Sequence, residues 1–158
     1  MIEPREEFLV MAFEVAVRGV ESGVGGPFGA LVVRGDDVLS TASNQVVSTN
    51  DPTAHAEIGA IRAACAALNA FQLDDCDLYA SCEPCPMCLG AIYWARPRAV
   101  FFSATRDDAA RAGFDDAFVY DELALPPDER TLPMRRVEHP EAGAPFAAWA
   151  SKPDRVEY

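Results

Sequence analysis

The chain has 158 residues, half of them apolar, and 13 basic against 25 acidic residues give it a formal charge of −12. This length and apolar content predict one compact domain over residues 1–158 with a core of its own. The negative charge argues against a nucleic-acid partner, and no apolar run approaches the roughly 20 residues of a membrane span.

The first half of the chain alternates between helical and strand-like patterns. Apolar residues at helical spacing predict an amphipathic helix near residues 5–21, which ends before the glycine-rich segment 23–27. Short apolar runs predict two strands, at 28–33 and 38–42, with a turn between them. An alanine-rich segment with apolar spacing predicts the next helix over 54–70.

The alternation continues in the second half. We expect a strand at 78–81, a helix at 86–96 that stops at Pro97, and a strand at 99–103. From Arg106 onward, glycine and proline residues separate short helical segments. Strands that alternate with helices indicate a layered α/β domain.

One histidine and two cysteines have the spacing of a catalytic zinc site. His55-Ala56-Glu57 lies near one predicted helix start, and Pro84-Cys85-Pro86-Met87-Cys88 lies at another. An imidazole and two thiolates are three ligands, one fewer than a closed structural site uses, which leaves a position for water. The order H-x-E and then P-C-x-x-C resembles the signature of zinc-dependent base deaminases. We therefore predict one zinc ion per subunit, held by His55, Cys85 and Cys88.

Glu57 is the predicted general acid and base of this site. Two thiolates offset the charge of zinc, so a nearby carboxylate is needed to take a proton from the activated water and deliver it to a leaving amine. Two other interpretations stay open. Cys82 would complete a closed structural zinc site, and Cys85 with Cys88 alone would make a redox pair that leaves His55 unexplained.

The cysteines also predict the compartment. Five is an odd number, and three of the five lie within seven residues, which favours metal binding over disulfides and a reducing compartment. The first residues lack the order of a signal peptide, so we expect the cytoplasm. Cys65 and Cys76 are interpreted as core or incidental thiols, and Cys82 as packed at a strand end.

Further segments resemble the cytidine deaminase-like family and, within it, the bacterial guanine deaminases. The resemblance rests on residues 25–30, 50–57, 82–96, 113–116 and 157–158. It implies a three-layer α/β/α fold with a mixed five-stranded sheet and a homodimer whose C-terminal segment, about residues 130–158, exchanges between subunits. It also implies hydrolytic deamination of guanine to xanthine and ammonia, a step of purine catabolism or salvage.

The same resemblance implies roles for five residues that patterns alone do not assign. Asn44 would recognise an edge of the base, since an amide both donates and accepts. Asp116 would join Glu57 in moving protons. Phe28 and Trp94 would stack against or wall the ring, and Tyr158 would close over the pocket, in one arrangement from the partner subunit. From the residues alone, Asn44 would be a turn residue and Phe28 and Trp94 core residues.

Three alternative functions stay open. Similar scaffolds act on guanosine, on s-triazines such as ammeline, or on other small aminated rings. The tRNA adenosine deaminases share the zinc motif, although the charge of −12 argues against them. A non-catalytic zinc scaffold would instead have four protein ligands at the metal and no exchangeable water.

Overall fold

The structure, a computed structural model, describes residues 2–158, and its contacts divide the chain into two units, the first ending at Ala117 and the second beginning at Phe118. The first unit contains α1 (Glu6–Glu21), β1 (Gly29–Arg34), β2 (Asp37–Ser43), α2 (Val46–Thr49), α3 (Ala56–Leu68), β3 (Asp77–Cys82), α4 (Pro86–Ala95), β4 (Ala99–Ala104) and α5 (Arg106–Arg111). The helix α6 (Ala117–Ala124) begins at the boundary, and α7 (Ala144–Ser151) belongs to the second unit.

The four strands form one mixed sheet in the order β2-β1-β3-β4. Strand β1 is antiparallel to both β2 and β3, whereas β3 and β4 are parallel. The α/β class and the mixed sheet are as predicted. The prediction of a fifth strand is wrong for the described residues, which form four. After β4 the chain enters a capped helix and a proline-rich stretch, which offers no alternating apolar run to pair with the β4 edge.

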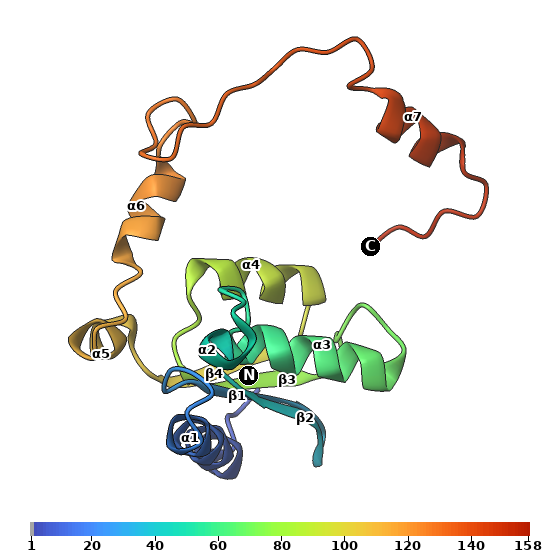
Figure 1. Ribbon diagram of the computed structural model, residues 1–158. Coiled ribbons are helices and arrows are strands. Elements are labelled where there is room, and N and C mark those ends of the chain that lie inside the picture. Colours follow the sequence, from blue (N-terminus) through green and yellow to red (C-terminus); the bar gives the residue numbers. More distant parts are fainter. Residues whose placement is uncertain (1) are drawn as a thin grey trace. The chain divides into compact units, whose positions relative to one another are not determined.

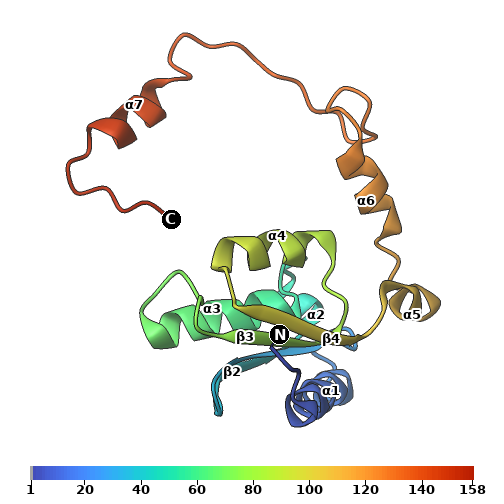
Figure 2. The same cartoon turned by 180° about the vertical axis from the view of Figure 1, so that it is seen from behind.

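Helices cover both faces of this sheet, with α1 on one face and α3 and α4 on the other (Figures 1 and 2). Strand β1 contributes to the packing on both faces, because its successive side chains point to opposite sides of the sheet. Leu31 and Val33 pack against Phe8 of α1. Ala30 and Val32 belong to the larger core beneath α3 and α4.

Most predicted elements are confirmed within a residue or two, and the exceptions have local causes. The helix predicted from residue 54 begins only at Ala56, because Asp51 accepts hydrogen bonds from the amide and hydroxyl of Thr53 and makes a turn first. That turn leaves His55 as the residue that caps α3. Helix α2 was not predicted, since four residues are too short to show a helical period.

The three cysteines outside the zinc pattern lie in or near the core. Cys82 is buried at the last position of β3, as predicted, and its Sγ donates to the carbonyl oxygen of Thr105. Cys76 is buried, which raises the pKa of its thiol to about 12. Cys65 is partly buried on α3.

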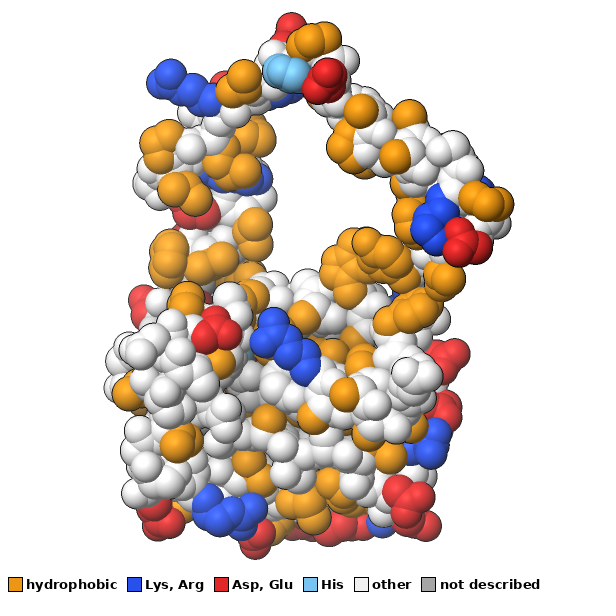
Figure 3. Space-filling model, turned by 45° about the vertical axis from the view of Figure 1, so that its right-hand side comes forward, with side chains coloured by type: hydrophobic (Ala, Val, Ile, Leu, Met, Phe, Trp, Pro, Cys, Tyr) orange, Lys and Arg blue, Asp and Glu red, His pale blue; other side chains and the backbone are white. Residues whose placement is uncertain are grey.

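The second unit is rich in exposed apolar side chains. No residue between Phe118 and Tyr158 is buried, although α7 alone carries Phe146 and Trp149. Apolar side chains are displayed along this segment in Figure 3. The predicted exchange of residues 130–158, and with it the single-domain prediction, stays a prediction. In the part of the chain that the structure describes, no helix has the length and apolar character needed to cross a membrane.

Candidate metal centre and substrate cavity

The three predicted metal ligands converge at the starts of two helices. His55 is the N-cap of α3, and Cys85 is the N-cap of α4, where Pro86 occupies the first helical position. The sulfur atoms of Cys85 and Cys88 each lie 3.5 Å from Nδ1 of His55. The ligand atoms of these three residues all lie within 4.8 Å of one another.

The chemistry of this donor set fits zinc. One imidazole nitrogen and two sulfurs are a ligand set of catalytic zinc sites, in which three protein ligands leave the fourth position open. Cys85 caps α4 and Cys88 lies in its first turn, where the positive end of the helix dipole favours thiolates. A hydrogen bond from Cys88 lowers the pKa of the Cys85 thiol, while the same bond and burial raise the pKa of Cys88.

Cys82 does not belong to this cluster. Among the described residues, the group of metal-ligating side chains contains His55, Cys85 and Cys88 alone. The Sγ of Cys82 is instead directed to the Thr105 carbonyl, at 3.4 Å. The geometry therefore favours a site with an open position over a closed site of three cysteines and one histidine.

Glu57 is buried beside the metal ligands. It lies in the first turn of α3, and its Oε2 accepts a hydrogen bond from Sγ of Cys88 at 3.5 Å. Burial raises the pKa of its carboxyl group above the usual value. The residue also lines the adjoining cavity. A carboxyl group in this position can exchange protons with a molecule held between the cavity and the metal.

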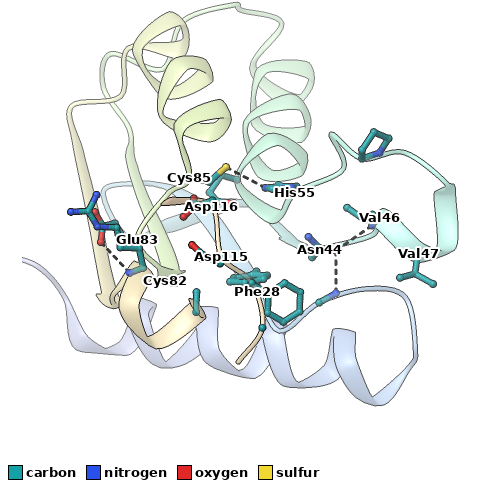
Figure 4. A pocket seen from close by; sticks show the side chains of 17 residues that line it. Phe28, Asn44, Val46, Val47, His55, Cys82, Glu83, Cys85, Asp115 and Asp116 are labelled. Carbon is teal, nitrogen blue, oxygen red and sulfur yellow. Dashed lines mark hydrogen bonds between the residues drawn. The ribbon is translucent and has the colours of Figure 1, made fainter. Parts of the chain in front are cut away.

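A cavity of about 430 Å³ opens next to this cluster (Figure 4). Its size is within the range of small-molecule sites. It is lined by residues from strand ends, loops and short or starting helices: Gly26, Phe28, Asn44, Val46, Val47, Pro52, His55, Glu57, Cys82, Glu83, Cys85, Arg106, Ala109, Gly113, Phe114, Asp115 and Asp116. The structure thus brings together the predicted residues Phe28, Asn44, Glu57 and Asp116 around the two metal ligands that line the cavity, His55 and Cys85.

Asn44 is buried at the wall of the cavity, and the oxygen of its side-chain amide is hydrogen-bonded. Its Oδ1 accepts hydrogen bonds from the backbone amides of Gly26 at 3.1 Å and Val46 at 3.2 Å. The backbone amide of Asn44 donates to the carbonyl oxygen of Phe28 at 2.9 Å. Because Oδ1 is already occupied twice, the amide offers Nδ2, a hydrogen-bond donor, for recognition.

Two phenylalanines and an aspartate complete the wall. The rings of Phe28 and Phe114 meet edge to face with centroids 5.1 Å apart. Asp116 follows two residues after Phe114, and partial burial, with the nearby Cys85, raises the pKa of its carboxyl group. Gly113 has a positive φ of 91°, so a residue without a side chain suits the turn that brings Phe114 and Asp116 to the cavity.

The other two predicted residues, Trp94 and Tyr158, both have exposed side chains. Trp94 lies on α4 and its side chain is 64% exposed. Tyr158 belongs to the second unit and is 70% exposed. Their contribution to substrate binding stays a prediction.

Several cavity residues were not assigned by sequence reasoning. Phe114 lies inside a matched segment, yet only Asp116 was singled out there. Glu83 and Arg106 follow the ends of β3 and β4, and Oε2 of Glu83 accepts the backbone amide of Arg106 at 3.1 Å. A signal did exist, since side chains just beyond the carboxyl ends of parallel neighbouring strands gather at one edge of a sheet.

Comparison with known proteins agrees with this site. The sequence model of the family described as "Cytidine and deoxycytidylate deaminase zinc-binding region" matches residues 2–104, which include all three predicted metal ligands. The fold and the site therefore define the class: a deaminase of the zinc-binding type.

Individual relatives narrow the class. Guanine deaminase of Bacillus subtilis (strain 168) is 55% identical over 97% of this chain and 98% of the relative. The X-ray structure of guanine deaminase from Bacillus subtilis has a TM-score of 0.96, with 54% identity and 99% of each chain covered. A tRNA-specific adenosine deaminase of Aquifex aeolicus (strain VF5) is 44% identical over 77% of this chain and 79% of the relative. The chain belongs to the cytidine deaminase-like zinc family and, within it, to the guanine deaminases.

Proposed function

We propose that this chain catalyses the zinc-dependent hydrolysis of guanine to xanthine and ammonia, a step of purine catabolism or salvage. The observation that supports this most strongly is the buried Glu57, which lies against the Cys88 metal ligand and also lines the cavity. The similarity to a guanine deaminase over nearly the whole chain supports guanine as the ring.

His55, Cys85 and Cys88 would hold the zinc ion. When bound, zinc supplies a Lewis acid that lowers the pKa of a water molecule and so provides a nucleophile at neutral pH. In the proposed hydrolysis, the oxygen of a water molecule would add to C2 of guanine, and the bond between C2 and the exocyclic nitrogen would break. The products, xanthine and ammonia, account for all atoms of guanine and one water.

Glu57 moves the protons of this reaction. It takes one proton from the water and transfers it to a ring nitrogen, and a second proton leaves with the ammonia. Asp116, at the same cavity, supports the second transfer. Its carboxyl group, like that of Glu57, has a raised pKa, which suits a group that must give as well as accept protons.

The remaining cavity residues bind and orient the ring. Nδ2 of Asn44 donates to an acceptor on the base edge, because its Oδ1 is held by two backbone amides. Phe28 and Phe114 offer aromatic surface to a planar ring.

Both thiol ligands must stay reduced to bind metal, which supports a reducing compartment such as the cytoplasm.

We also propose that the enzyme works as a homodimer. The outer face of α4 exposes the apolar side chains of Met87, Leu89, Tyr93 and Trp94. The second unit has no buried residue between positions 118 and 158, so its apolar side chains need a partner surface. A second copy of the chain, with exchange of residues 130–158, would cover both. Sedimentation at a series of concentrations tests this, and a monomer at all of them would contradict it.

One substrate experiment tests the proposed activity. Zinc-loaded protein is offered guanine, guanosine, ammeline, cytosine, cytidine and a tRNA, and ammonia release is measured for each. We expect guanine to be turned over and xanthine to appear in equal amount. Turnover of another small ring would keep the reaction and change the substrate, whereas turnover of tRNA alone would replace the proposal with tRNA editing.

A further inference from the structure

Gly25 lies against Asn44 more closely than any residue with a side chain could. A Cβ atom built on Gly25 would come within 2.3 Å of the Asn44 carbonyl oxygen and within 2.4 Å of its Oδ1. No alternative side-chain rotamer relieves this contact, because one of the two atoms is backbone. The same Cβ would also lie 2.7 Å from the carbonyl carbon of Asn44.

The loop that carries Gly25 cannot easily move away. Three hydrogen bonds join residues 24–28 to residues 44–48 on both sides of the contact. The amide of Ser48 donates to the Val24 carbonyl oxygen at 3.0 Å. The amide of Gly26 donates to Oδ1 of Asn44 at 3.1 Å, and the amide of Asn44 donates to the Phe28 carbonyl oxygen at 2.9 Å. An added methyl group at position 25 would have to break at least one of these bonds.

Gly25 itself does not line the cavity, whereas Asn44 does. Any effect of position 25 on the ligand therefore passes through its neighbours. Among the atoms that its side chain would meet, the polar side-chain atom is Oδ1 of Asn44. That atom fixes which way the amide is turned, since it accepts from Gly26 and Val46 and leaves Nδ2 as the donor.

We propose that Gly25 is a positioning residue for substrate recognition: the missing side chain lets the loop close on Asn44 and hold its amide with Nδ2 directed to the base edge. This inference rests on the proposed function, in that it assigns the recognising atom of the same cavity. It also restricts the ligand to rings that present a hydrogen-bond acceptor at the edge facing Asn44, as a purine carbonyl or ring nitrogen does.

The test is a double-mutant cycle with Gly25→Ala and Asn44→Ala, read out as kcat/KM for guanine. We expect Gly25→Ala alone to lower kcat/KM about tenfold or more, in line with loss of one hydrogen bond to the substrate. In the Asn44→Ala background the same substitution should lower kcat/KM by a clearly smaller factor, because the side-chain amide is gone and only the contact with the backbone of residue 44 remains. Equal effects in both backgrounds would overturn the proposal.

Two matched variants guard against a general folding defect. Gly143→Ala makes the same substitution where no atom lies within 4 Å, and wild-type kinetics are expected. Asn44→Asp keeps oxygen acceptors for the amides of Gly26 and Val46 but removes the Nδ2 donor. It should retain zinc while KM for guanine rises about tenfold or more. If Asn44→Asp kept the wild-type KM, the assigned donor would be wrong even if Gly25→Ala did not fold.

A crystal structure of Gly25→Ala separates this inference from the proposed function, because it needs no turnover. The expected result is an Asn44 Oδ1 that no longer accepts from both backbone amides. An unchanged amide with both hydrogen bonds intact would overturn the inference. If the wild-type protein itself released no ammonia from guanine, the proposed function would fail, and the structural outcome would still decide the role of Gly25.

Discussion

The two sides of the cavity are built in different ways. The metal side consists of residues at the N-termini of α3 and α4, where His55 and Cys85 are capping residues and Glu57 is buried within the first turn. The ring side consists of loops, with Phe28 just before β1, Asn44 just after β2 and Phe114 after α5. Backbone hydrogen bonds hold Asn44, and the rings of Phe28 and Phe114 contact each other. We infer that the metal side fixes the reaction, and the ring side fixes which molecule undergoes it.

This difference predicts two kinds of mutational response. Under the proposed function each metal-side residue has a chemical task that no neighbour can take over, so its loss should abolish turnover. Ring-side residues share the work of binding, and each loss should lower affinity by a limited factor.

Cys85→Ser should have the largest effect. Serine oxygen is a poor replacement for a thiolate ligand, so the zinc content should fall well below one per chain and turnover should disappear. Atomic absorption and ammonia release measure the two losses. The matched control is Cys82→Ala, three residues earlier, which should retain zinc because its sulfur faces Thr105. Loss of zinc from that control would instead favour a closed site in which Cys82 is the fourth ligand.

Phe114→Ala should have an intermediate effect on the ring side. It removes a ring that packs edge to face on Phe28, and such contacts contribute about 0.5–1.5 kcal/mol beyond simple burial. KM for guanine should rise roughly threefold to tenfold while zinc content stays at the wild-type value. Phe114→Leu keeps an apolar side chain, so its KM for guanine should lie between those of the wild type and Phe114→Ala. A complete loss of turnover in Phe114→Ala would break the contrast between the two sides.

Asp77→Asn should affect stability and leave catalysis unchanged. Asp77 is buried at the opposite end of β3 from Cys82, and Arg98 donates to its two carboxylate oxygens at 2.9 and 2.5 Å. Replacing the charged partner of this half-exposed arginine should lower the free energy of unfolding by about 1–2 kcal/mol. Denaturant unfolding measures the change, and kcat/KM for guanine should match the wild type. A tenfold loss of kcat/KM would mean that the far end of β3 is coupled to the site.

The contrast between the two sides also explains what could be predicted from the sequence. The metal side was readable because each ligand stands within a few residues of a helix-start signal: Pro86 after Cys85, and Asp51-Pro52-Thr53 before His55. The positions of the metal ligands could therefore be predicted from residues close to them in the sequence. Periodicity likewise predicted α1, α3, α4 and the four strands, because each buries a regular stripe or face.

The ring side was not readable in this way. Asn44 and Phe114 lie 70 positions apart, and only the fold brings them to one cavity. Family resemblance supplied Asn44 and Asp116, but it also supplied a fifth strand that the described residues do not form. The closeness of Gly25 to Asn44 depends on the path of two loops, which no local pattern encodes. Tertiary arrangement, rather than residue type, decided these features.

Glu57 touches the metal ligand Cys88 and also lines the cavity, so its removal is the sharpest test of the proposed mechanism. The measurement is kcat for guanine of zinc-loaded Glu57→Ala beside wild type, with zinc content determined on the same samples. We predict one zinc per chain in both and a kcat at least about 10²–10⁴-fold lower in the variant, the range that positioned acid–base groups contribute. A variant with full zinc and wild-type kcat would contradict the claim that this buried carboxyl group carries the protons of the reaction.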